Sequence, residues 1–117
     1  MKIQIKRVYE APEPTDGYRI LIDRLWPRGL TKDSAAVDEW VRDASPSTEL
    51  RRWFGHEPER WAEFKRRYLD ELHHEPAAAA LERLRKAAAR QRVTLLYGAK
   101  DEAHNNAVVL LELLREH

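Results

Sequence analysis

Polar and apolar residues alternate at the start of the chain, which is the pattern of a half-buried strand. Ile3 and Ile5 stand between lysines and a glutamine, and Val8 follows, so we predict a first strand over residues 2–8. The unbroken apolar run Ile20–Ile22 predicts a second strand that is covered on both faces. The stretch "RVTLLYG", residues 92–98, predicts a third strand.

Helical spacing of apolar residues dominates the rest of the chain. Thr31 or Asp33 is expected to cap a helix that includes Val37, Trp40 and Val41. Four further helices are predicted: one that starts near Ser47 or Thr48 and stops before Gly55, and three over residues 57–72, 76–91 and 102–115.

The order of these elements predicts the fold class. A long helical crossover joins the second and third strands, and such a connection favours parallel strands in one sheet. The length of 117 residues suits a single domain spanning residues 1–117. We therefore expect a small layered α/β domain with a short, largely parallel sheet flanked by helices.

Composition narrows the classes of function. Lys and Arg total 21 against 20 for Asp and Glu, so the net charge of +1 does not indicate a general polyanion binder. The chain has no cysteine, which excludes disulfides, thiolate catalysis and cysteine-bound metals. No signal-peptide pattern or membrane-length apolar run is visible, so a cytoplasmic location without a membrane partner is expected. Walker A, GxGxxG, HExxH and GxSxG motifs are absent, and no cofactor is expected.

Two polar clusters follow the second and third strands. They are "DRLWPRG", residues 23–29, and "GAKDEAHNN", residues 98–106. Carboxyl ends of parallel strands lie at one edge of a sheet, where open α/β sheets bind ligands. We therefore expect the two clusters to meet in one cleft.

The chemistry of these clusters suits a phosphate or carboxylate group. Arg24, Arg28 and Lys100 supply positive charge, and the first turn of the last helix offers free N–H groups. His104 is the candidate for proton transfer because imidazole titrates near neutrality, and either Asp23 or Asp101 could orient it. Asp23 is also a candidate second acid or base. The remaining candidate ligand-binding residues are Trp26, Asp101, Asn105 and Asn106.

Each candidate also has a purely structural interpretation. Asp101 could be a helix cap, His104 a structural histidine and Lys100 a solvated side chain. Arg24 and Arg28 could pair with Asp23, Asp16 or surface glutamates, and Trp26 could pack in the core instead of stacking on a flat ligand. His56 could be a capping or loop residue. A metal site from His104, Asp101 and Asp23 lacks a recognisable ligand spacing, so no metal is expected.

The predicted helices also carry aromatic and basic residues. The aromatic set is expected to form the core or to line a cleft under the helices: Trp40, Trp53, Phe54, Trp61, Phe64 and Tyr68. The basic set could be a nucleic-acid face: Arg51, Arg52, Arg60, Lys65, Arg66 and Arg67. Acidic residues are interleaved among these cations, however, which is typical of a solvated, salt-bridged surface.

Three long segments resemble a known family. "DRLWPRG", "PSTELRRWFGHEPERWAEFKRRY" and "LLYGAKDEAHNNAVVLLELL" are similar, in this order, to the DUF488 family in its short YeaO-like branch. The resemblance covers nearly the whole chain and implies a small α/β domain with a site at the two strand ends. Other members of the family carry cysteines in the third-strand motif, where this chain has Gly98 and Asn105, so no thiol chemistry carries over.

These observations favour a pocket for a small anionic ligand, bearing a phosphate or carboxylate, at the carboxyl edge of the sheet. In an enzyme, His104 would be the acid or base. One alternative is a non-catalytic module that senses a metabolite or docks a protein. Another is a nucleic-acid-binding domain that uses the arginine-rich helices. The sequence leaves the oligomeric state open.

Overall fold

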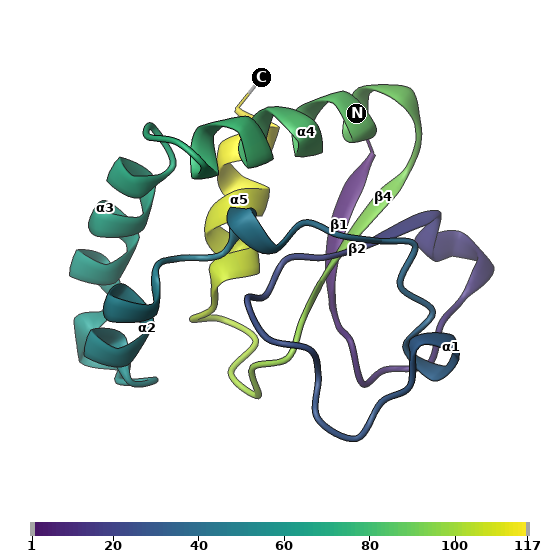
Figure 1. Cartoon of the computed structure of the whole chain (residues 1–117), viewed down its shortest axis with the longest axis horizontal. Helices are drawn as coiled ribbons and strands as arrows, with labels where there is room; N and C mark the ends of the chain where they lie inside the picture. Colours follow the sequence, from purple (N-terminus) through teal and green to yellow (C-terminus); the bar gives the residue numbers. More distant parts are fainter. Residues whose placement is uncertain (1, 117) are drawn as a thin grey trace.

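A four-stranded parallel sheet forms the centre of the molecule (Figure 1). The structure is a computed structural model and describes residues 2–116. Its strands are β1 (Ile3–Arg7), β2 (Tyr18–Leu21), β3 (Glu39–Trp40) and β4 (Val93–Tyr97), in the spatial order β1-β4-β2-β3. All three strand pairs are parallel, which confirms the predicted parallel pairing of the second and third predicted strands, now β2 and β4.

Within residues 2–116, five α-helices surround the sheet: α1 (Lys32–Ala35), α2 (Thr48–Phe54), α3 (Trp61–Glu71), α4 (Ala77–Arg90) and α5 (Asn106–Arg115). The sequence signals for α2 are confirmed. The Ser47 hydroxyl accepts a hydrogen bond from the Leu50 N–H, and Gly55 ends the helix at a φ of 53°. The arrangement is the small layered α/β domain that the element order predicts.

The two faces of the sheet carry unequal layers. Ile20, Ile22 and Leu95 belong to the main core, which α2, α3, α4 and α5 cover. Leu21 and Leu96 alternate with them and face a smaller cluster that includes Ala35 of α1. The unbroken apolar runs therefore reflect strands that are covered on both faces, as expected of parallel sheets.

A buried polar network supports the smaller layer. The Arg19 guanidinium donates to the Asp16 carboxylate at 2.5 Å and to the carbonyls of Ala35 and Ala36. The Lys6 ammonium also contacts Asp16, at 3.1 Å. Asp16, which the sequence left open as a partner of Arg24 or Arg28, therefore pairs with Arg19 and Lys6 instead.

The predicted extent of the first helix is wrong. The helix expected through Val37 and Trp40 ends at Ala35, since Ala36 adopts a left-handed conformation at a φ of 50°. Glu39 and Trp40 instead pair with Ile20 and Leu21 as the edge strand β3. Backbone pairing with an exposed sheet edge outweighs the weak helical spacing of this segment.

The last helix begins at Asn106, four residues after the predicted start. Residues 101–105 form a turn that side-chain hydrogen bonds hold together. None of the helices within residues 2–116 is long and apolar enough to cross a membrane.

Candidate functional site

The two polar clusters meet at the carboxyl edge of the sheet. The Ile22 N–H donates to the Leu96 carbonyl at 3.1 Å, which continues the β2–β4 pairing beyond β2. One residue later, the Asp23 carboxylate accepts the Gly98 N–H at 2.8 Å. The segments that leave these strands are therefore joined directly, as the parallel pairing predicts.

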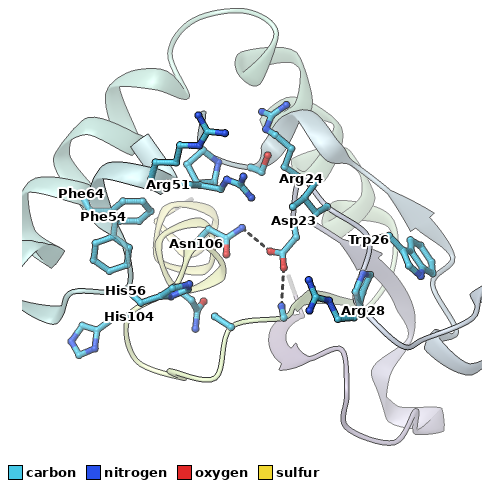
Figure 2. A pocket seen from close by; sticks show the side chains of 18 residues that line it. Asp23, Arg24, Trp26, Arg28, Arg51, Phe54, His56, Phe64, His104 and Asn106 are labelled. Carbon is cyan, nitrogen blue, oxygen red and sulfur yellow. Dashed lines mark hydrogen bonds between the residues drawn. The ribbon is translucent and has the colours of Figure 1, made fainter. Parts of the chain in front are cut away.

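A pocket of about 700 Å³ opens at this junction (Figure 2). Three stretches of chain line it, together with one residue of α3. The lining residues are Asp23, Arg24, Leu25, Trp26, Pro27 and Arg28; Ser45, Pro46, Arg51, Arg52, Phe54 and His56; Phe64; and Gly98, Ala99, His104, Asn105 and Asn106. The volume lies within the range of about 300–1,000 Å³ that is typical of small-molecule sites.

Most of the candidate residues lie in this pocket. Seven of the nine line it: Asp23, Arg24, Trp26, Arg28, His104, Asn105 and Asn106. The other two, Lys100 and Asp101, do not line the pocket. Lys100 is exposed and Asp101 is half-buried. Lys100 therefore does not join Arg28 in the lining of the pocket, contrary to the expectation.

Asp23 occupies the centre of the pocket (Figure 2). Its second carboxylate oxygen accepts the Asn106 side-chain N–H at 3.1 Å, and the same amide donates to the Ile22 carbonyl. Burial raises the pKa of Asp23 above its ordinary value, against the opposing influence of the Gly98 N–H, the Asn106 amide and the Arg51 charge. The carboxylate thus ties β2, β4 and α5 together and remains in contact with the pocket.

His104 lies in the turn before α5, not on the helix face that the sequence predicted. Its Nδ1 lies 2.9 Å from an Asp101 carboxylate oxygen, and its ring meets Trp61 edge-on, with 5.3 Å between ring centres. The other Asp101 oxygen accepts the N–H groups of Ala103 and His104. The hydrogen bond from His104 is the main cause that lowers the pKa of Asp101 below its ordinary value. Of the two candidates to orient His104, Asp101 makes the contact.

Asn105, not Asp101, caps α5. Its side-chain oxygen accepts the Val108 N–H at 3.1 Å, and its amide donates to the Asp101 carbonyl at 2.9 Å. The amide nitrogen and the oxygen of this side chain are both hydrogen-bonded within the protein, and only 4% of the residue is exposed. Asn105 therefore has a structural role at the site and does not present a free polar group to a ligand.

Trp26 belongs mainly to the smaller core cluster. Its ring N–H donates to the Leu30 carbonyl at 2.7 Å, and its ring packs edge-on against Trp40 with 5.5 Å between centres. In Figure 2 it lies at the edge of the pocket farthest from Phe54 and Phe64. Its position matches the packing interpretation of the sequence.

Charge is unevenly distributed around the pocket. Among the described residues, four arginines line it, Arg24, Arg28, Arg51 and Arg52, against one acidic residue, Asp23. Within residues 2–116, the Nε atoms of Arg24 and Arg51 are buried and have no hydrogen-bond partner. Neither Arg24 nor Arg28 forms an ion pair with a described acidic residue.

Sequence reasoning missed the contribution of the segment that contains Arg51. It placed Arg51 and Arg52 on a solvated or nucleic-acid-binding surface and left His56 open as a loop residue. The cause is β3, which no pattern in the sequence marks: the Val41 N–H donates to the Leu21 carbonyl, so the chain leaves this strand at the same sheet edge. If a strand had been predicted at Glu39–Trp40, the segment that follows it, including α2, would have been expected beside the pocket.

The other helix cations are largely engaged with partners. Arg66 and Arg67 contact the Glu63 carboxylate at 2.6 and 2.8 Å, and Lys65 pairs with Glu112. Arg67 also stacks over the Trp53 ring, at 4.4 Å from its centre. This surface has the salt-bridged character that its mixed charges indicate.

Metal-binding geometry is not apparent in the described part of the chain. Across residues 2–116, no group of three or more His, Asp or Glu side chains is placed to hold a metal ion. Asp101 and His104 form a pair, but the Asp23 carboxylate is bound to Gly98 and Asn106.

Comparison with known proteins places this architecture in a family. Residues 2–117 match the family model DUF488-N3i, described as the inactive DUF488-N3 subclade. The chain is 50% identical over 116 residues to the uncharacterised protein YeaO of Escherichia coli K12, covering 98% of each chain. It is 45% identical over 113 residues to the uncharacterised proteins Mb3100c of Mycobacterium bovis and Rv3073c of Mycobacterium tuberculosis, covering 97% of this chain and 93% of each relative. No solved structure matches it. With a model match along almost its entire length and relatives of this identity, the chain belongs to the DUF488 family, in its DUF488-N3i subclade.

Proposed function

We propose that the pocket at the carboxyl edge of the sheet binds a small anion that carries a phosphate or carboxylate group. The excess of guanidinium over carboxylate groups in its lining supports this function. Guanidinium groups bind such anions through paired, charge-assisted hydrogen bonds.

The observation that carries the proposal is the pair of unsatisfied Nε atoms of Arg24 and Arg51. A buried donor without a partner costs about 1–3 kcal/mol, so folded proteins rarely retain one without a reason. Arg24 follows β2 and Arg51 belongs to α2, yet both side chains lie at the same end of the pocket (Figure 2). An anion bound between these two side chains would pair with both guanidinium charges, and it would accept the Nε hydrogen bonds only after the side chains shift to uncover those atoms.

The description of this subclade as inactive favours binding over turnover. We therefore place ligand binding, for sensing or regulation, ahead of catalysis. The absence of cysteine agrees with this order, because it removes the strongest nucleophile among the side chains.

Calorimetric titration with phosphate and with sulfate tests the proposal. Both anions should bind the wild-type protein, and Arg51→Gln should weaken binding about ten- to a hundredfold, the equivalent of one charged hydrogen bond. Lys86→Gln is the matched control, since it removes one positive charge from an exposed position on α4 outside the pocket. Equal affinities for both variants would show that the anion binds through general charge and not in this pocket.

A second candidate function is acid–base catalysis by His104. The observation in its favour is the Asp101–His104 pair beside the pocket, which occupies Nδ1 and leaves Nε2 as the nitrogen for proton exchange with a ligand. In this case a panel of phosphate esters should contain one whose hydrolysis is lost in His104→Asn while its binding persists. Turnover that survives this substitution would exclude the histidine mechanism.

A further inference from the structure

The pocket is larger and more aromatic than a bare inorganic anion requires. A phosphate ion occupies a small part of a 700 Å³ pocket, whose size suits a ligand of many atoms. Four rings of the lining form one side of it, and we name them the aromatic wall: Phe54, His56, Phe64 and His104. We infer, on the basis of the proposed function, that the natural ligand is an anion attached to a flat, aromatic or heteroaromatic ring.

The aromatic wall is assembled from three separate parts of the chain. Phe54 ends α2 and stacks on Phe64 of α3, with 4.4 Å between ring centres and an interplanar angle of 28°. The His56 ring lies 6.4 Å from Phe54. His104 comes from the turn before α5 and is held against Trp61. The rings of Phe54, Phe64 and His104 are therefore fixed by packing or by a hydrogen bond, which reduces the entropy lost when a ligand contacts them.

The wall and the arginine pair lie on different sides of the same pocket. Figure 2 shows Phe54, Phe64, His56 and His104 on one side, Arg28 on the opposite side and Arg24 and Arg51 at the top, with Asp23 between them. A single ligand could thus place its anionic group at Arg24 and Arg51 and its ring against the wall.

Aromatic pairs gain affinity beyond what the burial of apolar surface contributes, because their positive edges and negative faces attract each other. A ring of the ligand should therefore contribute more here than an aliphatic group of similar size. We expect an aryl phosphate to bind about tenfold more tightly than a methyl phosphate of the same charge.

Calorimetric titration with three monoesters tests the inference: methyl, cyclohexyl and phenyl phosphate. Phenyl phosphate should bind most tightly, cyclohexyl phosphate more weakly and methyl phosphate weakest. Phe54→Leu should reduce the preference for phenyl over methyl phosphate several-fold, whereas Trp53→Leu should preserve it. Trp53 is the matched control because it lies on the same helix, is half-buried and does not line the pocket.

A second variant protects the test against a folding defect in Phe54→Leu. His56 is exposed and has a φ of 59°, a conformation that asparagine tolerates, so His56→Asn removes a ring of the wall without removing core packing. This variant should also lose part of the preference for phenyl phosphate.

The possible outcomes separate the two proposals. Equal binding of methyl and phenyl phosphate, or equal binding of cyclohexyl and phenyl phosphate, would overturn the flat-ring inference and leave anion binding intact. An unchanged preference in both Phe54→Leu and His56→Asn would also overturn it. Failure of all three esters and of inorganic phosphate to bind would overturn the proposed function together with the inference.

Discussion

Asp23 links the chain segments that build the pocket. Its two carboxylate oxygens accept hydrogen bonds from Gly98 and Asn106. Asp23→Asn replaces one carboxylate oxygen with an NH₂ group. This group is a donor, so it cannot accept the hydrogen bond from either Gly98 or Asn106 that the oxygen accepted. We expect this variant to lose about 1–3 kcal/mol of unfolding free energy at acidic pH, as measured by urea denaturation.

The pH dependence of that loss follows from the raised pKa of Asp23. Burial raises it above the ordinary value of 3.8, so the folded state holds the proton more tightly than the unfolded state. The stability from this group is complete below pH 3.8 and is lost as the pH rises through the raised pKa. The difference between wild type and Asp23→Asn should therefore shrink with rising pH over this window. Other carboxyls titrate in both proteins and cancel, and a difference that grows with pH would mean that the pKa of Asp23 is lowered.

The apolar residues on one face of helix α3 differ in how deeply they are buried. Phe64 and Tyr68 are 2% and 0% exposed, which confirms that they are core residues, whereas Trp61 is only half-buried and contacts His104. We expect Phe64→Ala to cost about 3–5 kcal/mol of unfolding free energy. Trp61→Ala should cost only about 1–3 kcal/mol despite the larger ring, because less of its surface leaves water on folding.

Urea denaturation of both variants measures this order, and circular dichroism confirms that each is folded. Equal losses would show that Trp61 is packed in solution as fully as Phe64. A loss below that of Phe64→Ala, combined with weaker binding of an aryl phosphate, would show that Trp61 supports the aromatic wall through His104.

Across the whole molecule, the parallel sheet gathers distant segments at one edge. Residues 23–28 follow β2, residues 45–56 follow β3, and residues 98–106 follow β4. The net charge of the chain is only +1, yet four arginines converge on one pocket with one carboxylate. The overall charge balance therefore does not reveal the local potential, because the compensating acidic residues lie on other surfaces, such as Glu63 and Glu112.

Elements with strong local signals were predictable. Ser47 and Gly55 bound α2, Pro76 precedes α4, and the apolar runs of β2 and β4 lie in the core as expected. Each depends on neighbours in the chain: a hydroxyl that caps its own helix, a glycine that adopts positive φ, or an apolar run too long for a solvent-facing strand. The meeting of Asp23 with Gly98 was also predictable, because a long helical crossover favours parallel strands, and the carboxyl ends of parallel strands lie at the same edge of the sheet.

Contacts between distant segments were not predictable from these local signals. The strand β3 exists because β2 offers an open edge, and the two residues Glu39 and Trp40 carry too little pattern to indicate it. The exit of β3 in turn brings Arg51 to the pocket, whereas Lys100 lies outside the pocket lining. The sequence by itself thus determined most helices and strands and the sheet edge at which the candidate site lies, because these depend on local propensity and on strand direction. Which side chains share the pocket depended on packing between segments far apart in the chain, and no local pattern encodes that.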